Sequence, residues 1–325
     1  MSDWRPTAAI EVLRLRADLL ARARAFFAER GVLEVDTPAL SAATVTDLHL
    51  TGFKTCYHGP GPRSCGVCYL HTSPEFPMKR LLAAGSGPIY QFAKVFRDGE
   101  AGARHNPEFT LLEWYRPGFD HHRLMLEVAE LMMLWLAPVR TLAAPEFVSY
   151  RELFQTRLGF DPHTASGPEL AGCARQQGLT VPGLDGQDTD GWLDLLISHC
   201  IEPTLGDGRL SFVYDYPASQ SALARIRPGQ PPLAERFELY LDGIELANGF
   251  HELADAEEQQ RRFEQDNTAR RQRGLPTMPI DQALLAALPQ LPDCAGVALG
   301  FDRLVMIAAG CRSISEVLTF PFDRA

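Results

Sequence analysis

The sequence has no excess of basic residues, no long apolar run and no internal repeat. Its 31 lysines and arginines are outnumbered by 41 aspartates and glutamates, so the formal net charge at pH 7 is −10. This charge argues against a protein that holds nucleic acid through a general basic surface. The first residues, MSDWRPTAAIEVLRLRADLL, interrupt their apolar side chains with Glu, Arg and Asp too often for a signal peptide or a membrane span. We therefore expect a soluble, cytoplasmic protein with no membrane partner.

The sequence also lacks a complete cysteine pattern. Seven cysteines are an odd number for disulfide pairing, and their dispersal through a long chain suits a reducing compartment. Cys65 and Cys68 have the spacing of a metal-binding knuckle, but no second Cys or Cys/His pair at a suitable spacing completes a zinc site. We interpret them as two thiols in a surface loop. The GxxxxGKS/T and GxGxxG signatures are absent too, so a nucleotide would be bound by a different fold.

Hydrophobic periodicity and capping signals predict an α+β fold, in which helices flank a run of antiparallel strands. Further expectations concern single elements. The first helix spans residues 9–30 and presents an apolar stripe of Ile10, Leu13, Ala17, Leu20 and Phe27. Other helices are predicted at 73–84, 121–136 and 255–273, strands at 89–97, 107–116 and 294–301, and a hairpin at 234–249 that turns at Asp242-Gly243. We expect residues 1–325 to form a single domain, with a mostly helical insertion at about 146–210 beside the sheet.

The hairpin at 234–249 places two acids on one face of the sheet. Its two-residue turn puts Glu238 diagonal to Glu245, because side chains alternate along each strand. Two carboxylates about 7 Å apart repel each other unless a cation lies between them, and Mg²⁺ bridging phosphates is the natural candidate. Ala247 and Gly249 continue this face and leave room for a ligand. A solvated outer face with two incidental acids is an equally acceptable interpretation.

A second predicted hairpin and the strand before Arg303 carry complementary groups. Arg97 ends one strand beside small residues, and a lone guanidinium can clamp a carboxylate or a phosphate. On the return strand, Phe109 offers a surface for a base, while Glu113 and Tyr115 suit an ammonium group. Arg303 follows a glycine-rich strand at a helix start, where partial positive charge favours phosphate. Each feature alone is also explained by a core strand or a common strand–helix junction.

In combination, two arginines, two acids and an aromatic side chain are what a site needs to activate a carboxylate with ATP. The carboxylate attacks the α-phosphorus, and the arginines and the metal neutralise the charge that develops. No covalent protein nucleophile is required.

Several stretches resemble a known family, in order along nearly the whole chain. ARAFFAERGVLEVDTPAL resembles motif 1 of the class II aminoacyl-tRNA synthetases, FAKVFRDGEAGARHNPEFTLLEWY resembles motif 2, and GVALGFDRLVM resembles motif 3. TSPEFPMKRLL and RFELYLDGIELANGFHEL resemble the lysine-specific branch. The chain opens directly at the first catalytic helix, so we expect no N-terminal OB domain and no anticodon-dependent tRNA binding. A free-standing lysyl core of this length resembles the elongation factor P–lysine ligases.

That resemblance implies an enzyme that uses ATP and Mg²⁺ to adenylate lysine, preferably (R)-β-lysine, and transfers it to a lysine side chain of elongation factor P. It also implies a homodimer, because motif 1 forms the dimer interface in the family. Arg97 would hold the α-phosphate and the substrate carboxylate, and Arg303 would face the adenine and reach the γ-phosphate. The resemblance also implies adenine contacts for His105, Asn106 and Phe109, and magnesium binding by Glu238 and Glu245. Glu75 would bind the substrate amino group, and Asn248 would lie beside the substrate carboxylate. The ε-ammonium would be surrounded by Glu113, Tyr115 and Glu252.

Two positions depart from the family pattern. Motif 2 usually reads Arg-x-Glu, but Gly99 occupies the third position here and the acid follows at Glu100. Either the loop shifts by one residue or this ATP contact is lost. Ala298 lies where tRNA-charging lysyl synthetases usually have Gly. One added methyl group shifts selectivity by only about 1–3 kcal/mol, so Ala298 favours the ligase branch without deciding it.

Three other functions compete with this interpretation. A truncated lysyl-tRNA synthetase is disfavoured by the acidic charge, the missing anticodon domain and Ala298. An ammonia-dependent asparagine synthetase is disfavoured because Glu113, Tyr115 and Glu252 suit an ammonium side chain and no arginine is placed for a β-carboxylate. A non-catalytic regulatory paralogue would have no need of Arg97.

Overall fold

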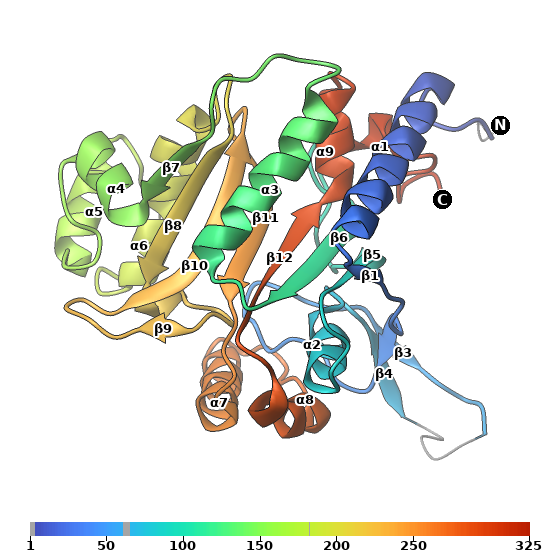
Figure 1. Cartoon of the computed structure of the whole chain (residues 1–325). Coiled ribbons are helices and arrows are strands. Elements are labelled where there is room, and N and C mark those ends of the chain that lie inside the picture. The colour runs from blue at the N-terminus through green and yellow to red at the C-terminus, as the bar shows by residue number, and fades with distance from the viewer. Residues whose placement is uncertain (1–3, 61–65, 182) are drawn as a thin grey trace. The chain divides into compact units, whose positions relative to one another are not determined.

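The computed structural model describes residues 4–60, 66–181 and 183–325, and the chain forms two compact units (Figure 1). The first unit consists of Met1–Gly118 and Ala254–Ala325, and the second of Phe119–Leu253. This division follows the packing of the chain. A single catalytic domain with a helical insertion remains a prediction.

The first unit contains a sheet whose strands come from distant parts of the sequence. Its order is β1 (Leu33–Glu34), β5 (Ile89–Phe96), β6 (Glu108–Pro117) and β12 (Cys294–Gly300). β1 is parallel to β5, and the other neighbours are antiparallel. A smaller antiparallel sheet has the order β2 (Leu40–Ser41), β4 (Val67–Leu70) and β3 (Lys54–Cys56). The three strands predicted for this unit are confirmed.

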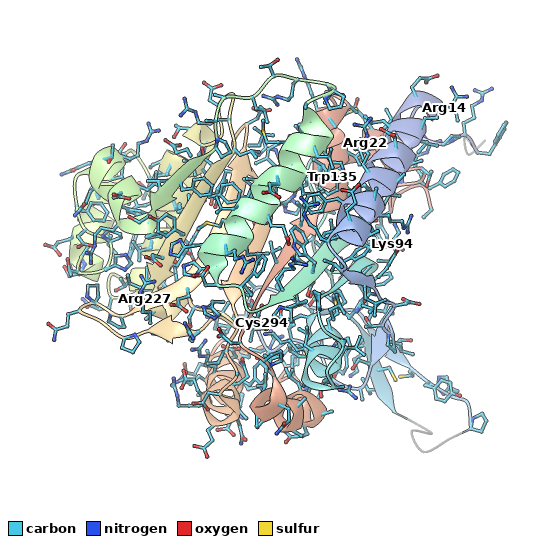
Figure 2. All side chains as sticks on the ribbon, in the orientation of Figure 1. Arg14, Arg22, Lys94, Trp135, Arg227 and Cys294 are labelled. Carbon is cyan, nitrogen blue, oxygen red and sulfur yellow. The ribbon has the colours of Figure 1, made fainter. Side chains whose placement is uncertain are left out.

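Helix α1 (Ile10–Glu29) covers one face of the larger sheet. Phe27 stacks on Tyr90 of β5 with 4.3 Å between ring centroids, and it meets Trp114 of β6 at 5.5 Å. Cys294, the first residue of β12, is fully buried (Figure 2). Aromatic burial of this kind contributes on the order of 2 kcal/mol per side chain, so this layer holds the sheet in place.

The buried stripe of α1 differs from the predicted one. Leu19, Ala23, Phe26 and Phe27 are buried, whereas Ile10 and Ala17 are exposed. The prediction was wrong because a charged residue, Arg16, lies on the inner stripe. Its guanidinium pairs with the buried carboxylate of Asp302 in helix α9 (Phe301–Ala308) and donates to Thr110 Oγ1 at 2.8 Å. A pattern of apolar residues alone cannot reveal that partner.

Three further helices of the first unit pack together. They are α2 (Glu75–Ala83), α7 (Ala256–Gln272) and α8 (Gln282–Ala287). Phe76 of α2 meets Phe263 of α7 with 5.9 Å between ring centroids. The Oγ of Ser73 accepts a hydrogen bond from the N–H of Glu75 at 3.0 Å, and Gly85 follows the helix with a φ of 88°. The predicted stop at Gly85 is confirmed, whereas the helix starts at Glu75 with Pro74 and not Ser73 as its N-cap.

The second unit contains strands in the order β11 (Ile244–His251), β10 (Leu233–Leu241), β8 (Ser211–Pro217) and β7 (Glu146–Ser149). A short strand, β9 (Ile226–Arg227), also pairs with β10. β10 and β11 form the predicted hairpin, and its turn residues Asp242 and Gly243 have positive φ angles of 52° and 68°. Helix α3 (His121–Leu136) has the predicted bounds and packs on β10 and β11 (Figure 1).

The segment predicted to be mostly helical carries its own core. After β7 it contains α4 (Tyr150–Leu158), α5 (Gly167–Gln176) and α6 (Thr189–Leu196), which is continued by a π-helical stretch, η1 (Ile197–Ile201), and a 3₁₀ turn, η2 (Glu202–Thr204). Phe154, Leu170, Trp192 and Ile201 are buried there. The helical character is confirmed, and β7 is the strand that the prediction missed. The remaining 3₁₀ turns are η3 (Ala218–Gln220), η4 (Leu288–Gln290) and η5 (Ile314–Glu316).

The expectations about membrane spans and about the Cys65–Cys68 loop can be compared with the structure. Among the helices of the described residues, none combines the length and the apolar character that crossing a membrane requires. Cys68 is buried within β4, so the prediction of a surface loop was wrong for this thiol, because its strand pairs with both neighbours in the smaller sheet. Cys65 lies outside the described residues.

Candidate active site

The face of the larger sheet away from Phe27 carries the predicted chemistry of the first unit. Strand register sets Gln91, Glu113 and Ala298 side by side on β5, β6 and β12. Directly opposite residues of antiparallel strands project to the same face, so the methyl group of Ala298 lies beside the Glu113 side chain. Phe109 and Ala298 pack against the neighbouring small cluster of Ala93, Val95 and Leu111. The predicted faces of both strands are confirmed, and they form a floor of small side chains.

Glu113 is the buried acid of this face. It is 2% exposed, its Oε2 accepts from Ser73 Oγ at 2.7 Å, and its Oε1 accepts from the Tyr115 hydroxyl at 2.6 Å. A carboxylate held by two donors in a buried place is oriented before any ligand arrives. The structure thus brings together two residues that the sequence predicted as a pair, and it adds Ser73.

Glu75 lies at the start of α2, where it has a partner that the sequence analysis missed. Its Oε1 accepts from the ammonium of Lys79 at 2.6 Å, and Lys79 is 1% exposed. The spacing of four residues along a helix was the available signal for this pair. A substrate amino group near Glu75 would share the carboxylate with Lys79.

Arg97 follows β5 and contacts two other predicted residues. Its guanidinium lies 5.0 Å from the centre of the Phe109 ring, and its Nη1 is 3.7 Å from Glu100 Oε1. Gly99 has a φ of 83°, a left-handed conformation that strains residues with a side chain. The turn therefore requires glycine at the usual acid position, and the acid moves to Glu100, which still reaches Arg97.

His105 and Arg303 meet across the loop between β5 and β6. Arg303 Nη2 donates to His105 Nε2 at 2.8 Å, and Arg303 Nε reaches the carbonyl of Arg104 at 3.4 Å. Partial burial and the neighbouring Arg303 charge lower the pKa of His105 below 6.5. A neutral imidazole is the form that can accept a hydrogen bond from an arginine. The two predicted adenine-site residues are therefore in contact with each other.

The side chain of Asn106 holds the same loop. Its Nδ2 donates to the carbonyl of Glu108 at 2.6 Å, and its Oδ1 accepts from the N–H of Phe322 at 3.0 Å. Both polar ends of this buried amide thus bind backbone groups of the fold. A contact of Asn106 with adenine stays a prediction.

The remaining predicted residues lie in the second unit, on the β10–β11 hairpin. Its register begins as predicted at the turn, but a β-bulge between Leu239 and Tyr240 then shifts the pairing, so that Glu238 lies opposite Asn248. A one-residue shift moves every following side chain to the other face. The prediction that Ala247 and Gly249 continue the face of Glu238 was therefore wrong, and Asn248 takes that place.

Both carboxylate oxygens of Glu238 contact side chains of the same unit. Its Oε2 accepts from the hydroxyl groups of Tyr216, at 2.7 Å, and Tyr240, and its Oε1 pairs with Arg236. Arg236 also donates to Asn248 Oδ1 at 3.3 Å. The sequence argument required a cation beside this acid, and Arg236 is one that it did not consider.

The acids of this face fit a divalent cation. Burial, together with the charges of Glu238 and Glu245, raises the pKa of Glu202 to about 7. Like charges near a carboxyl group favour its protonated form, and Mg²⁺ is bound by one or two carboxylates with substrate oxygens. Glu238 and Glu245 are the residues that would hold it. Glu252 follows β11, is buried and pairs with Ala224 in an isolated β-bridge.

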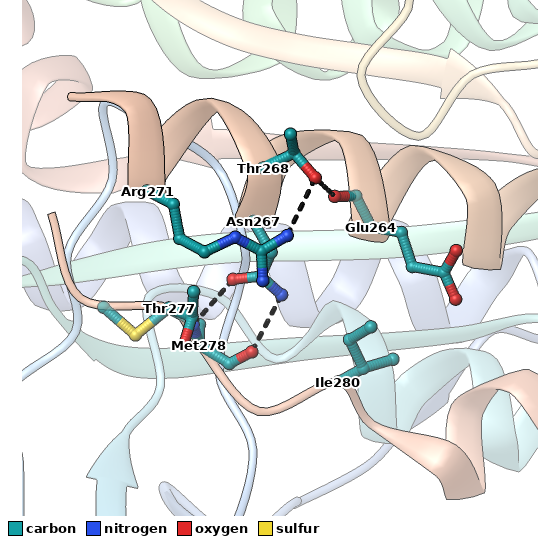
Figure 3. Close-up of a pocket in the computed structure, with 7 residues that line it drawn as sticks. All are labelled: Glu264, Asn267, Thr268, Arg271, Thr277, Met278 and Ile280. Atoms are coloured by element: carbon teal, nitrogen blue, oxygen red, sulfur yellow. Dashed lines mark hydrogen bonds between the residues drawn. The ribbon is translucent and has the colours of Figure 1, made fainter. Parts of the chain in front are cut away.

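The structure also contains a polar pocket of about 490 Å³ on α7 (Figure 3). Its polar side chains are largely satisfied by one another: Arg271 donates to Thr268 Oγ1 at 3.0 Å, and Asn267 bonds the backbone of Met278 in both directions. None of its lining residues is a predicted site residue. They are Glu264, Asn267, Thr268, Arg271, Thr277, Met278 and Ile280.

Comparison with known proteins identifies the family of this arrangement. The family described as tRNA synthetases class II (D, K and N) matches residues 1–324. The chain belongs to the class II tRNA synthetases. A protein of Vibrio vulnificus named elongation factor P–(R)-β-lysine ligase is 55% identical over 325 residues, which are 100% of this chain and 99% of the relative. Proteins of the same name from Vibrio cholerae and Salmonella paratyphi B are 54% and 52% identical over the same shares of both chains.

Membership in the class II tRNA synthetases confirms the predicted α+β fold class and the resemblance that the motifs indicated. The motif 2 stretch of the class II synthetases is the hairpin of β5 and β6, and the motif 3 stretch is β12 with α9. Among the described strand pairs of the sheet, β5–β6, β6–β12, β10–β11 and β8–β10 are antiparallel, whereas β1–β5 and β7–β8 are parallel.

Proposed function

We propose that this protein is an ATP-dependent ligase that activates lysine, preferably (R)-β-lysine, as an aminoacyl-adenylate and transfers it to a lysine side chain of elongation factor P. The observation that carries the proposal is the identity of 52–55% over the full chain with relatives of that name. An ammonium-binding site around Glu113 supports the choice of substrate, because its carboxylate is buried and oriented.

In the first step, an oxygen of the substrate carboxylate attacks the α-phosphorus of ATP, and pyrophosphate leaves. Arg97 stabilises the charge on the α-phosphate and the carboxylate, while Arg303 supports the γ-phosphate. Phe109, His105 and Asn106 contact the adenine, and Glu100 binds ATP from the motif 2 turn. Mg²⁺ on Glu238 and Glu245 would neutralise phosphate charge.

In the second step, the amine of the acceptor lysine attacks the acyl carbon, AMP leaves, and an amide is formed. The substrate is held by its two ends: Glu113, Tyr115 and Glu252 surround the ε-ammonium, and Asn248 lies at the carboxylate. Glu75 binds the other amino group. The position of Ala298 beside Glu113 supports a role of its methyl group in distinguishing the position of an amino group on the substrate chain.

Two further parts belong to the proposal. The protein acts as a cytoplasmic homodimer, and the described surface of the motif 1 stretch supports an interface. Leu33 and Leu40 in that stretch are 56% and 44% exposed, so two large apolar side chains of motif 1 are available for contact with a partner chain.

The test is amino-acid-dependent ATP–pyrophosphate exchange with (R)-β-lysine, α-lysine, aspartate and no addition. We expect exchange to be strongest with (R)-β-lysine, followed by incorporation of labelled β-lysine into elongation factor P and none into tRNA. Exchange with aspartate, labelling of tRNA alone, or silence with every amino acid would contradict the proposal. In the Ala298→Gly variant, we expect the preference to move toward α-lysine by about 10- to 200-fold.

A further inference from the structure

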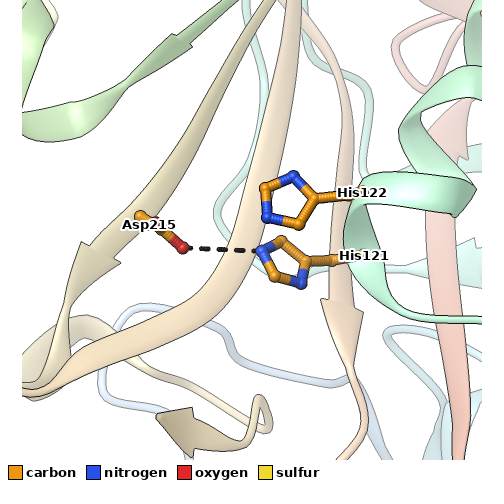
Figure 4. Close-up of side chains that lie close together, drawn as sticks. All are labelled: His121, His122 and Asp215. Atoms are coloured by element: carbon orange, nitrogen blue, oxygen red, sulfur yellow. Dashed lines mark ion pairs between the residues drawn. The ribbon is translucent and has the colours of Figure 1, made fainter. Parts of the chain in front are cut away.

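A group of metal-ligand side chains lies at the start of α3, within the second unit. His121 and His122 are the first two residues of the helix, and Asp215 comes from β8 (Figure 4). The three residues offer donor atoms that all lie within 4.8 Å of one another. None of them belongs to the groups proposed to bind ATP or lysine.

His121 has no hydrogen bond that explains its burial, although its Nε2 forms a long ion pair with Asp215 Oδ1 (Figure 4). The residue is 1% exposed, and neither ring nitrogen makes a hydrogen bond to any of the described residues. Asp215 Oδ1 also accepts no hydrogen bond from the described residues, while its Oδ2 accepts from Arg227 Nη2 at 2.7 Å. Buried polar atoms of this kind are rare because each costs about 1–3 kcal/mol. A group that binds both would remove this cost.

The distances match two ligands on one metal ion better than a hydrogen bond. His121 Nε2 lies 3.5 Å from Asp215 Oδ1, beyond the range of about 2.7–3.2 Å for a good N–H···O contact. Two ligands on a tetrahedral zinc ion, each about 2.0–2.2 Å from the metal, lie about 3.3–3.5 Å apart. The ring of His122 is 4.1 Å from that of His121, and the side chain is exposed, which leaves a route from solvent.

The backbone directs Asp215 toward the histidines. Asp215 has a φ of 61°, which is uncommon for a residue other than glycine. The register between β8 and β10 shifts between Ala234 and Phe237, opposite this residue. A β-bulge of this type re-aims a side chain and is over-represented beside functional sites. We therefore attribute the position of the Asp215 carboxylate to this irregularity of the strand pair.

We propose that His121, His122 and Asp215 bind one divalent transition-metal ion of the zinc type. Neutral imidazole nitrogens and a carboxylate oxygen are the ligands that zinc prefers, and a water molecule would complete four-fold coordination. The ion would fasten the start of α3 to β8. Arg227 stays on the other carboxylate oxygen and orients it, as groups behind metal ligands commonly do.

A second triad, His121 with Glu235 and His251, is close by. There, His251 Nδ1 lies 2.9 Å from Glu235 Oε2, and Arg225 donates to that oxygen at 2.7 Å. Glu235 Oε2 thus already has two close contacts, whereas His121 and Asp215 approach only to 3.5 Å, so we assign the ion to the triad with His122 and Asp215.

The experiment uses the full chain without a histidine tag, after removal of metal with a chelator. Co²⁺ is titrated and followed by its visible absorption, and Zn²⁺ is titrated by calorimetry. We expect one equivalent to bind and the melting temperature to rise with Zn²⁺. His122→Gln and Asp215→Asn should weaken binding by at least about tenfold, and asparagine is chosen because it tolerates positive φ. His199→Gln, an exposed histidine of the same unit, should bind as the natural chain does.

Several outcomes would overturn the assignment. Absence of stoichiometric binding by the natural chain would leave the cluster as an ion pair between His121 and Asp215 without a metal. Unchanged binding in the His122→Gln variant, or loss in a His251→Gln variant alone, would place the metal elsewhere. If Asp215→Asn fails to fold, as judged by circular dichroism, the exposed His122 variant still decides the question.

Discussion

The carboxylate of Glu113 is where the proposed lysine specificity has its clearest physical basis. Its two donors, Ser73 and Tyr115, contact both oxygens, and a buried carboxylate oriented in this way suits an ammonium group. We expect Glu113→Gln to lower kcat/KM for lysine by at least about 30-fold, because removing one partner of a buried charge pair costs on the order of 2 kcal/mol or more. ATP–pyrophosphate exchange measures the loss.

A matched control lies on the same strand. Glu108→Gln makes the same chemical change at a side chain that is 51% exposed and 3.5 Å from Lys94, where surface pairs contribute little. Equal activity in both variants would remove Glu113 from the amine site. So would a raised KM for ATP with an unchanged KM for lysine in Glu113→Gln.

His105 gives the proposed ATP site a dependence on pH. Partial burial and Arg303 place its pKa below the ordinary value of 6.5, so at pH 7 the ring is neutral and accepts from Arg303. As the pH falls through that lowered pKa, the ring gains a proton, loses its acceptor and repels Arg303. We expect KM for ATP to rise as the pH falls through that lowered pKa and to stay nearly flat in His105→Gln, which retains an acceptor. Parallel pH profiles of the two proteins would contradict this role.

The β10–β11 hairpin shows both the strength and the limit of sequence reasoning about elements. Asp242-Gly243 and alternating side chains were sufficient to predict the turn and the first pairs. The bulge between Leu239 and Tyr240 could not be predicted, because it depends on how β8 packs against the hairpin and not on local propensity. It is the bulge that exchanges Ala247 for Asn248 beside Glu238.

The same hairpin allows a test of its turn. Gly243 has a φ of 68°, and a Cβ built there would lie 3.2 Å from the Cα and the carbonyl oxygen of Pro203. We expect Gly243→Ala to lower the free energy of unfolding by about 1–2 kcal/mol, the cost of a left-handed conformation for a residue with a side chain. Urea unfolding measures it.

Gly172 supplies the opposite control for that turn. It lies inside α5, and the nearest side-chain atom to a built Cβ is Nη2 of Arg175, on the same helix, at 3.9 Å. Gly172→Ala should therefore stabilise the protein by about 0.5–1 kcal/mol. If the Gly172→Ala variant is less stable than the natural chain, or if the Gly243→Ala variant unfolds with an unchanged free energy, the stability effects do not come from the backbone conformation of these glycines.

Across the chain, the predictable residues were those whose neighbours are close in sequence or fixed by strand alternation. Glu113 and Tyr115 are two apart on one strand, and their contact followed from the pattern. Two ion pairs were missed for different reasons. Arg16 and Asp302 come from distant segments of the chain. Arg236 is only two residues from Glu238, but the sequence argument considered a metal ion as the only cation for that acid. Distant polar partners need tertiary structure, which periodicity does not contain.

The proposed homodimer makes one prediction about the protein as an assembly. Leu33 and Leu40 are exposed within the motif 1 stretch, and a charge placed in an apolar interface must be desolvated without a partner. We expect Leu33→Glu to shift the sedimentation equilibrium from dimer toward monomer by at least about tenfold in Kd, since each 1.4 kcal/mol is a factor of ten. Val139→Glu is the matched control, because Val139 is 46% exposed and follows α3 outside that stretch. If the natural chain sediments as a monomer, or if both variants dissociate equally, the motif 1 surface is not the interface.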